Sequence, residues 1–462
     1  MPPLRWLSGR RRDACPRTST STFTYLCPTV SAPACAVTPR EWGRHMPGRV
    51  PGRGMTDELA FRPVGPDHYD AFRERVDYAF EPTEGPRDHD DEFDRIADPF
   101  GIFAGDDLRS ICAHYSFEAH LRGERVPLAG LAAVATPPEH RREGYVRHMV
   151  EASLARWRGE FPLAALWPFS RSYYEQFGWA TANTVCEYRI PLDQLSFARG
   201  SADGRPRRVS ADDWAALDDA YEARAADETL GLRRDERWWR ERVLDDDTYV
   251  YAWERDGETR GYVVYTFESS GEGIDDRRIA VSDLAAADDD TLRGLLGFLA
   301  DHDSQATEVK LYAPDDTLLD RVPTPGDVEC TVHTGPMVRA VDVTDALEAV
   351  PYPEGASAEL TLGVTDDTVA WNDDVFELAV AASGATCERI EGDASISPRA
   401  GSRSPAGDPD VTVDIGTLSQ LVVGYRDAAD LRRVGDLSAD GDALDDLAAL
   451  FPPERVALRD FF

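Results

Sequence analysis

Lysine is almost missing from this 462-residue chain, since Lys310 is the only one and arginine supplies every other cation. Acidic residues outnumber basic ones by 85 to 50, which gives a formal net charge of −35. A field of that sign repels phosphates and argues against a protein that binds nucleic acid or an anionic membrane. A dense carboxylate surface keeps a protein hydrated in molar salt, so we expect a cytoplasmic protein of a halophile. A GC-rich genome is the alternative source of the arginine excess.

Long apolar runs and cysteine pairs are also missing. No stretch reaches the roughly 18 apolar residues needed to cross a bilayer. The seven cysteines include no CxxC pair, and the four beyond residue 54 are expected to be isolated buried thiols. The acidic run 88–92 is expected to be a solvated surface. These absences predict a soluble, reduced protein without a bound metal.

The first 54 residues differ in composition from the rest of the chain. They hold nine arginines and only two acids, Asp13 and Glu41, and show no periodicity. The run Phe23–Val37 after Arg10–Arg12 is too polar for a good signal peptide. Residues 1–54 are therefore expected to be a disordered extension or the product of a wrongly assigned start, with Met55 as the true initiator.

From Met55 onward, helical and strand patterns alternate. Tyr69, Phe72, Val76 and Phe80 share one helical face, and Val126–Ala135 is a long apolar strand. A second helical stripe follows Gly144, and a further helix is expected at Ala428–Val434. Strands are expected at Ala164–Trp167, Val185–Ile190 and Val369–Asn372. Turns between strands are expected at Asp106-Asp107 and Asp256-Gly257, and a loop at Ser395–Pro409. The chain is 42% apolar, enough for several buried cores, and the pattern predicts an α+β or α/β protein.

The segment Val134–Arg147 is the most informative one for chemistry. It joins a buried strand to a helix through a loop that contains Arg141, Arg142 and Gly144. Such a loop directs backbone N–H groups toward one point at a helix N-terminus, where a pyrophosphate is stabilised. Glycine lets the backbone approach the phosphates, and the arginines add positive charge. The alternative is an ordinary strand–loop–helix crossover.

Three motifs in this chain occur together in a known family. Pro138–Gly144 resembles the cofactor signature of the GNAT acetyltransferase superfamily, with Val146 where a small residue is usual. Tyr174–Trp179 and Trp371-Asn372, the latter expected in a strand, extend the likeness to the Eis (enhanced intracellular survival) acetyltransferases. The resemblance covers nearly everything from Met55 to Phe462.

The resemblance implies tandem GNAT folds, each a mixed sheet flanked by helices, followed by a sterol-carrier-like α+β domain. The expected ranges are a catalytic domain at 55–200, a degenerate GNAT domain at 201–335 and the carrier-like domain at 336–462. It also implies a homohexamer. In the second domain, Asp288, Asp289 and Asp290 stand where the first has its cofactor loop, so we expect no cofactor there.

The resemblance also implies the site residues. Acetyl-CoA is the expected cosubstrate, and a tyrosine protonates its departing thiolate while the C-terminal carboxylate acts as base. By motif these are Tyr174, rather than its neighbour Tyr173, and Phe462. The residues implied to contact the cofactor are Val134, Ala135, Thr136, Arg141, Arg142, Glu143, Gly144, Tyr145, Val146, Arg147, Phe169 and Ser170.

The acceptor is less well defined by the sequence. A protein N-terminus, a lysine side chain, a polyamine or an aminoglycoside-like compound all fit an amine-accepting enzyme. Asp77 on the first helix is a weak candidate for binding the amine. His140 is expected to order the loop or to meet solvent, and a general base is the alternative. The alternative to an N-acetyltransferase is a non-catalytic acyl-CoA or lipid-binding protein with a vestigial GNAT domain.

Overall fold

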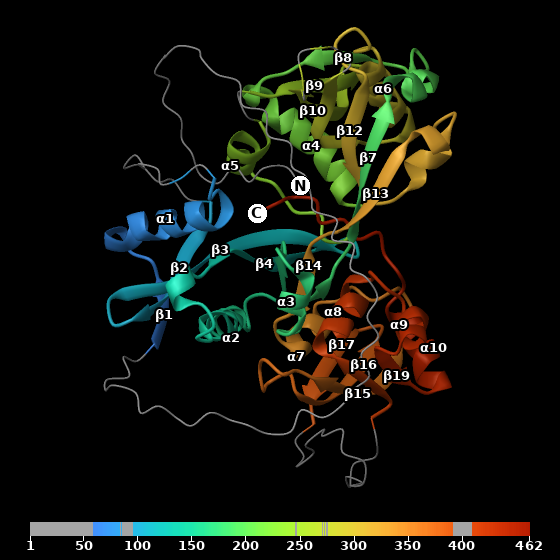
Figure 1. Ribbon diagram of the computed structural model, residues 1–462. Coiled ribbons are helices and arrows are strands. Elements are labelled where there is room, and N and C mark those ends of the chain that lie inside the picture. The colour runs from blue at the N-terminus through green and yellow to red at the C-terminus, as the bar shows by residue number, and fades with distance from the viewer. Residues whose placement is uncertain are drawn as a thin grey trace, which may run out of the picture.

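The computed structural model describes residues 59–83, 85, 96–244, 247–269, 271, 273, 276–390 and 409–462. These residues form three mixed sheets with flanking helices, seen as three bodies in Figure 1. The N-terminal extension, the acidic run 88–92 and most of the expected loop 395–409 lie outside the described residues. Within them, no helix is long and apolar enough to cross a membrane.

The first sheet has the order β1-β2-β3-β4-β5-β14-β6. Its strands are β1 (Leu59–Pro63), β2 (Asp98–Ala104), β3 (Asp107–Leu121), β4 (Glu124–Ala135), β5 (Leu163–Leu166), β6 (Ala180–Thr181) and β14 (Met337–Ala340). The expected hairpin around Asp106-Asp107 is confirmed, because β2 pairs with β3 in antiparallel register across it. β4 and β5 run parallel, as strands joined by a helical crossover do.

Helices cover both faces of this sheet, as the apolar periodicity predicts. They are α1 (Tyr69–Phe80), α2 (Tyr145–Trp157) and the short α3 (Arg171–Glu175). Alternate residues of β4 belong to different cores: Leu131 packs with Met149 and Leu154 of α2, whereas Leu128 belongs to the cluster that includes Phe72 of α1. The two faces of β4 therefore belong to two separate hydrophobic cores.

The second sheet has the order β13-β7-β12-β11-β10-β9-β8. Its strands are β7 (Thr184–Pro191), β8 (Arg205–Arg208), β9 (Tyr249–Arg255), β10 (Glu258–Ser269), β11 (Arg277–Ala286), β12 (Glu308–Ala313) and β13 (Glu329–Thr334). Its helices are α4 (Trp214–Ala225), α5 (Glu236–Trp238) and α6 (Asp289–Ala300). Asp256-Gly257 forms the predicted turn between β9 and β10.

Sheet membership does not follow the sequence ranges expected for the domains. β7 precedes residue 200 but pairs with β12 and β13 of the second sheet. β14 follows residue 335 but pairs with β5 and β6 of the first sheet. The chain leaves the first sheet after β6 and returns to it through β14, so the sheets are completed by strands far apart in sequence.

The third sheet has the order β17-β16-β15-β18-β19. Its strands are β15 (Ala358–Thr365), β16 (Asp374–Ala381), β17 (Gly384–Arg389), β18 (Val411–Asp414) and β19 (Leu437–Ala439), with helices α7 (Val343–Glu348), α8 (Ile415–Val423), α9 (Ala428–Val434) and α10 (Gly441–Leu450). The strand predicted at Val369–Asn372 was wrong, because these residues form a turn. Asn372 uses its side chain to accept a hydrogen bond from the Val343 amide, 3.0 Å away, and to donate to the Val341 carbonyl.

A buried arginine on β14 joins the first and third sheets. Arg339 is 0% exposed, donates to the Phe177 carbonyl and forms an ion pair with Asp366. Asn372 donates to the same carboxylate at 3.1 Å. Two segments singled out in the sequence, Tyr174–Trp179 and Trp371-Asn372, are therefore held together through Arg339.

The expectation of four isolated thiols was wrong for one pair. Cys112, Cys186 and Cys387 are buried free thiols, and Cys330 is half-buried. Cys186 on β7 lies within hydrogen-bonding distance of Cys330 on β13, and burial together with this neighbour raises the pKa of Cys186 to about 11. Register between distant strands, which spacing in the sequence does not encode, brings these thiols together.

Gly178 gives a test of the Arg339 contact. Gly178 and Gly159 both have φ of 76°, but a Cβ at Gly178 would overlap Nη1 of Arg339, whereas nothing lies within 4 Å at Gly159. Gly159→Ala should lower the free energy of unfolding by about 1–2 kcal/mol, because its backbone is left-handed. Gly178→Ala should lower it by about 3–5 kcal/mol more, which is the loss expected when a buried ion pair is broken. Denaturant unfolding measures both, and equal losses would contradict the role given to Arg339.

Candidate active site

The end of β4 is irregular where the candidate cofactor segment begins. Ala133 has φ of 50°, and the β3–β4 register shifts between the pairs Ile111–Ala135 and Ala113–Ala132, which marks a β-bulge. The pairing of β4 with β5 ends at Leu131 and Leu166, while β4 continues to Ala135. Val134 and Ala135 therefore extend past the end of β5.

The loop after β4 is held by its own short contacts. Ser110 on β3 donates to the Ala135 carbonyl at 3.1 Å and its hydroxyl lies 2.8 Å from that of Thr136. The Arg141 guanidinium donates to the Thr136 carbonyl at 2.9 Å. His140 lies 3.2 Å from Nη1 of Arg109 on β3, which agrees with a role in ordering the loop. The loop is thus fixed against β3 before α2 begins.

Residues 142–147 present their backbone N–H groups without an acceptor. None of the described residues accepts a hydrogen bond from these six amides, and the first amide of α2 with a partner is that of His148, 3.1 Å from the Gly144 carbonyl. Arg142 and Gly144 adopt left-handed backbone with φ of 66° and 86°, and the space around Gly144 is open. Consecutive free amides at the start of a 13-residue helix form an anion-binding concavity.

The side chains around these amides leave room for an anion. Arg141, Arg142 and Glu143 are exposed. Glu143 accepts a hydrogen bond at 2.7 Å from the hydroxyl of Tyr145, whose ring is buried. Val146 is half-buried, and Arg147 lies over the Phe177 ring at 5.1 Å. The segment implied by the signature is therefore a continuous open loop with two exposed arginines.

The equivalent loop of the second sheet is filled by its own carboxylates. Asp288 accepts from the Thr291 amide at 2.8 Å and caps α6, and its other oxygen pairs with Arg255 at 2.5 Å. Arg255 also pairs with Asp290 at 3.2 Å. These hydrogen bonds lower the pKa of Asp288, so a negative charge stands where the first domain has open amides. This arrangement disfavours a pyrophosphate.

Tyr174 is held in the core beneath α2. It lies on α3, packs with Phe177 and Met149, and has its ring 5.6 Å from that of Phe169. Burial, with smaller effects of Tyr173 and Cys112, raises the pKa of Tyr174. Its phenol therefore stays protonated at neutral pH. Phe169 is 69% exposed and Ser170 half-buried, both at the start of α3.

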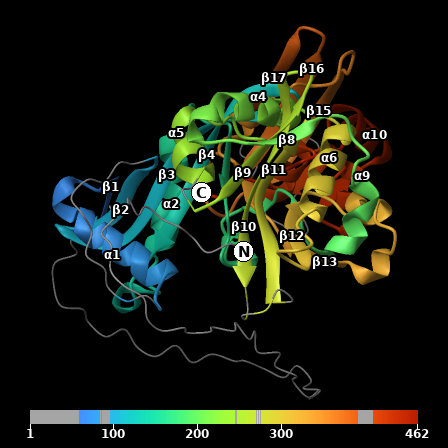
Figure 2. The ribbon, with the colours of Figure 1, turned by 90° about the horizontal axis from the view of Figure 1, so that it is seen from above.

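Phe462 is buried on the opposite face of the same sheet. It is 2% exposed, and its ring lies 4.8 Å from that of Phe117 and 5.4 Å from that of Tyr115, both on β3. Gly130 of β4 provides the space, because a Cβ there would come within 2.9 Å of the Phe462 ring. Figure 1 shows the C-terminus between α5 and the strands β3 and β4, and in Figure 2 it again lies close to these elements.

The structure places the predicted residues on both faces of the first sheet. The loop 134–147 and Tyr174 adjoin the α2 core, and Phe462 occupies the other core, where Trp167 just after β5 donates to the Asp460 carbonyl at 2.8 Å. Asp77 lies half-buried on α1. The described residues contain no group of three or more His, Cys, Asp or Glu side chains arranged to hold a metal ion.

Several residues that hold the site together were not singled out in the sequence. Gly130 makes room for Phe462, Arg339 fixes the Phe177 carbonyl, and Arg242 donates to the Phe461 carbonyl at 3.1 Å. Arg234 pairs with Asp460 at 2.8 Å. Their contacts span between 162 and 332 residues of sequence, so no local pattern marks them.

Comparison with known proteins agrees with this geometry. Residues 60–182 and 230–340 each match a family described as an acetyltransferase (GNAT) domain, and residues 343–459 match a sterol carrier protein domain. An uncharacterized N-acetyltransferase of Streptomyces griseus is 30% identical over 300 residues, which cover 57% of this chain and 71% of that protein.

Solved structures share the whole described fold. A probable N-acyltransferase of Enterococcus faecalis has a TM-score of 0.76 at 23% identity, and covers 88% of this chain and all of its own. Eis1 of Mycobacterium abscessus has a TM-score of 0.67 at 25% identity with the same coverage. The open amide loop, the tandem GNAT matches and the Streptomyces relative together show that this chain belongs to the GNAT family of acyl-CoA-dependent N-acetyltransferases.

Proposed function

We propose that this protein transfers an acetyl group from acetyl-CoA to a primary amine, with Tyr174 as general acid and the Phe462 carboxylate as general base. The observation that carries this proposal is the burial of Phe462 inside the GNAT domain itself, against β3 and β4. The residue lies 332 positions from Gly130, the glycine that makes room for its ring. A terminal residue seated there puts a carboxylate beside the split between β4 and β5.

The loop 136–147 binds the cofactor in this proposal. Its open amides and the exposed Arg141 and Arg142 suit a pyrophosphate, and the free edge of Val134–Thr136 beyond β5 suits an extended pantetheine arm. Phe169 and Ser170, at the start of α3, lie on the route from this loop to Tyr174. When bound, acetyl-CoA supplies the activated thioester.

Two groups on opposite faces of the sheet carry out the two proton transfers. The amine nitrogen forms a bond to the acetyl carbon, and the carbon–sulfur bond breaks. The Phe462 carboxylate takes the proton that the nitrogen loses, and the Tyr174 hydroxyl donates a proton to the departing sulfur. Burial keeps Tyr174 protonated until the sulfur leaves, which suits an acid rather than a base.

The acceptor class and the setting of the enzyme belong to the same proposal. A cationic amine, such as a polyamine, a lysine side chain, a peptide N-terminus or an aminoglycoside-like compound, is attracted by a net charge of −35. Asp77 on α1 is proposed to bind it. We further propose a cytoplasmic homohexamer that works in molar salt. A non-catalytic acyl-CoA or lipid-binding protein is the alternative that the experiments below distinguish.

Gly144→Asp tests the cofactor loop by placing an aspartate at the start of α2, where the second domain has Asp288 at the start of α6. Any side chain at this left-handed N-cap should destabilise the protein by about 1–2 kcal/mol, and an aspartate also places a negative charge beside the phosphates. At about 4 Å that repulsion amounts to ~1–4 kcal/mol, so calorimetry should show CoA binding weakened by about fivefold to several hundredfold.

Gly144→Asn is the matched control for that experiment. Asparagine has the same shape and strains the left-handed backbone in the same way but carries no charge, so this variant should bind CoA more tightly than the aspartate variant. Equal affinities in the two variants would mean that the loop does not hold the pyrophosphate.

The acid and the base can be tested separately by acetyl-CoA-dependent thiol release from residues 55–462 in molar KCl. Tyr174→Phe removes only the hydroxyl, and a C-terminal carboxamide removes only the charge of Phe462. Each change should lower kcat by about 10²–10⁴-fold and leave the Kd for CoA within about twofold, because neither group touches the loop.

Two glycines appended after Phe462 serve as a second change at the base, since they move the carboxylate instead of neutralising it. Full turnover in the carboxamide and extended chains would disprove the C-terminal base. CoA binding without turnover for any amine in the unmodified protein would favour the binding-protein alternative.

A further inference from the structure

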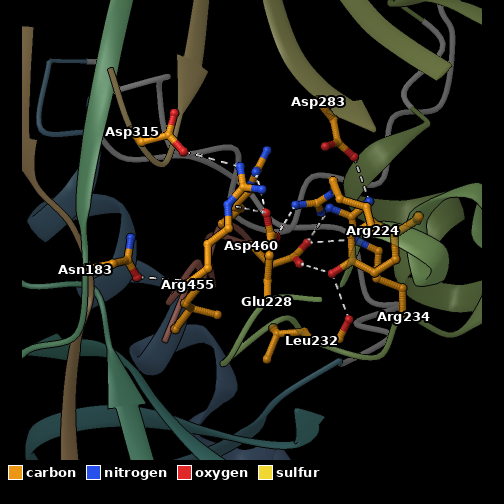
Figure 3. A network of polar contacts seen from close by, with 12 residues as sticks. Asn183, Arg224, Glu228, Leu232, Arg234, Asp283, Asp315, Arg455 and Asp460 are labelled. Atoms are coloured by element: carbon orange, nitrogen blue, oxygen red, sulfur yellow. Dashed lines mark hydrogen bonds and ion pairs between the residues drawn. The ribbon is translucent and has the colours of Figure 1, made fainter. Parts of the chain in front are cut away.

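The last residues of the chain enter a buried network of charged side chains in the second GNAT domain. Asp460 is 6% exposed, and its Oδ1 accepts from Arg234 at 2.8 and 2.9 Å and from the Trp238 indole at 3.0 Å. Figure 3 shows Asp460 and Arg234 in one network, although the two residues are 226 positions apart in sequence. A carboxylate is buried at such a cost only when it is paired and hydrogen-bonded.

Arg234 is itself fixed on its other side. It pairs with Asp283 of β11 at 2.6 Å, lies 3.1 Å from the Tyr262 hydroxyl and stacks over the Tyr221 ring at 3.9 Å. These carboxylates hold the pKa of Arg234 well above its usual value. The partner that the tail meets is therefore a rigid cation and not a mobile surface side chain.

A second set of contacts holds the segment just before Asp460. Arg459 pairs with the buried Glu228 at 2.7 Å, and Glu228 also pairs with Arg224. The Ala457 amide donates to the Thr229 carbonyl at 2.9 Å, and the Leu458 amide donates to Asn183 at 3.2 Å. Figure 3 shows Glu228 between the tail and Arg224. Residues 457–459 are tied to the body one after another.

The three final residues are each held by a different kind of contact. Asp460 is held by its carboxylate and its carbonyl, Phe461 by its carbonyl through Arg242 and its ring 5.2 Å from Trp167, and Phe462 by its ring. Only the last backbone bonds remain free to turn the terminal carboxylate. These contacts fix the chain end more firmly than the apolar packing of Phe461 and Phe462 alone would.

The charged pair also defines the register of the tail. Sliding the chain by one residue would bring Phe461 or the cation Arg459 to Arg234, leaving the buried guanidinium without its carboxylate. Breaking a buried ion pair is strongly destabilising because one charge is left uncompensated, so one register is strongly preferred. Because the pair is buried, salt screens it much less than it screens a surface pair.

We propose that the second GNAT domain serves as an anchor for the catalytic carboxylate, with Asp460 and Arg234 as the positioning pair. This proposal rests on the function proposed above, in which the Phe462 carboxylate is the base. In the second domain, Asp288 closes the loop that is equivalent to the cofactor loop. This domain contributes instead to the reaction of the first domain, because it holds the tail at Asp460, two residues before the reacting carboxylate.

Asp460→Asn tests the anchor, because it keeps the shape of the side chain and removes its charge. In the chain with a free carboxylate, kcat should fall by about 10–100-fold, the effect of misplacing a reacting group by roughly 1 Å, with KM for acetyl-CoA unchanged. In the carboxamide chain, where the base is already lost, the same substitution should lower kcat no further. This non-additivity is expected only if Asp460 acts through the carboxylate.

Asp288→Asn is the matched control, since it also removes a carboxylate from arginine pairs of the second domain, those with Arg255 and Arg260 at the start of α6, away from the tail. It should reduce the thermal stability while leaving kcat within about threefold. Arg242→Gln removes the donor to the Phe461 carbonyl, a contact that lies outside the buried network, and it should also lower kcat. This variant tests the anchor if the Asp460→Asn protein does not fold.

The outcomes separate the two proposals. An unchanged kcat in a folded Asp460→Asn or Arg242→Gln protein, together with a large loss in the carboxamide chain, would overturn the anchor and keep the base. Equal losses from Asp460→Asn in the carboxylate and carboxamide chains would also overturn it, as would an equal loss of kcat in Asp288→Asn. An unimpaired carboxamide chain would disprove the base itself.

Discussion

The exchange of strands between the sheets is the constraint on which the rest of this structure depends. β7 leaves the first GNAT unit to pair in the second sheet, and β14 returns to close the first sheet between β5 and β6. The return places Arg339 under the Phe177 carbonyl and sets the carrier-like domain beside α3. Because the first and second sheets each include a strand from elsewhere in the chain, the two GNAT units cannot be assembled independently, and the tail begins its course from a fixed position.

That exchange also explains which parts of the fold the sequence predicts. Patterns confined to one element identify α1, β4, α2 and α9 well, because helical and strand periodicities are local. Partner choice is not local: nothing within Met337–Ala340 distinguishes a strand of the first sheet from one of the third. The turn at Trp371-Asn372 was misassigned because its short apolar run resembles a strand, whereas its conformation is set by the bonds of Asn372 to Val343 and Asp366.

The candidate site divides in the same way. The cofactor loop can be predicted because its strand, arginines, glycine and helix lie within fourteen consecutive residues. The seat of Phe462 was suggested only by family resemblance. Arg234 and Asp460 gave no signal at all, since in a chain with 29% charged residues each resembles one more solvated surface group. Only the burial of both, 226 residues apart, reveals their role.

The two GNAT units show how stability and function compete at one position. Asp288 caps α6 with its side chain and pairs with two arginines, which stabilises that helix. At α2 the same position is Gly144, which makes no side-chain cap, and Arg142 holds a strained left-handed backbone. The first unit thus gives up about 1–2 kcal/mol of local stability to leave its amides open. The helix start is strained and poorly capped in the first unit and fully capped in the second. This difference is expected if selection has maintained an anion site in only the first unit.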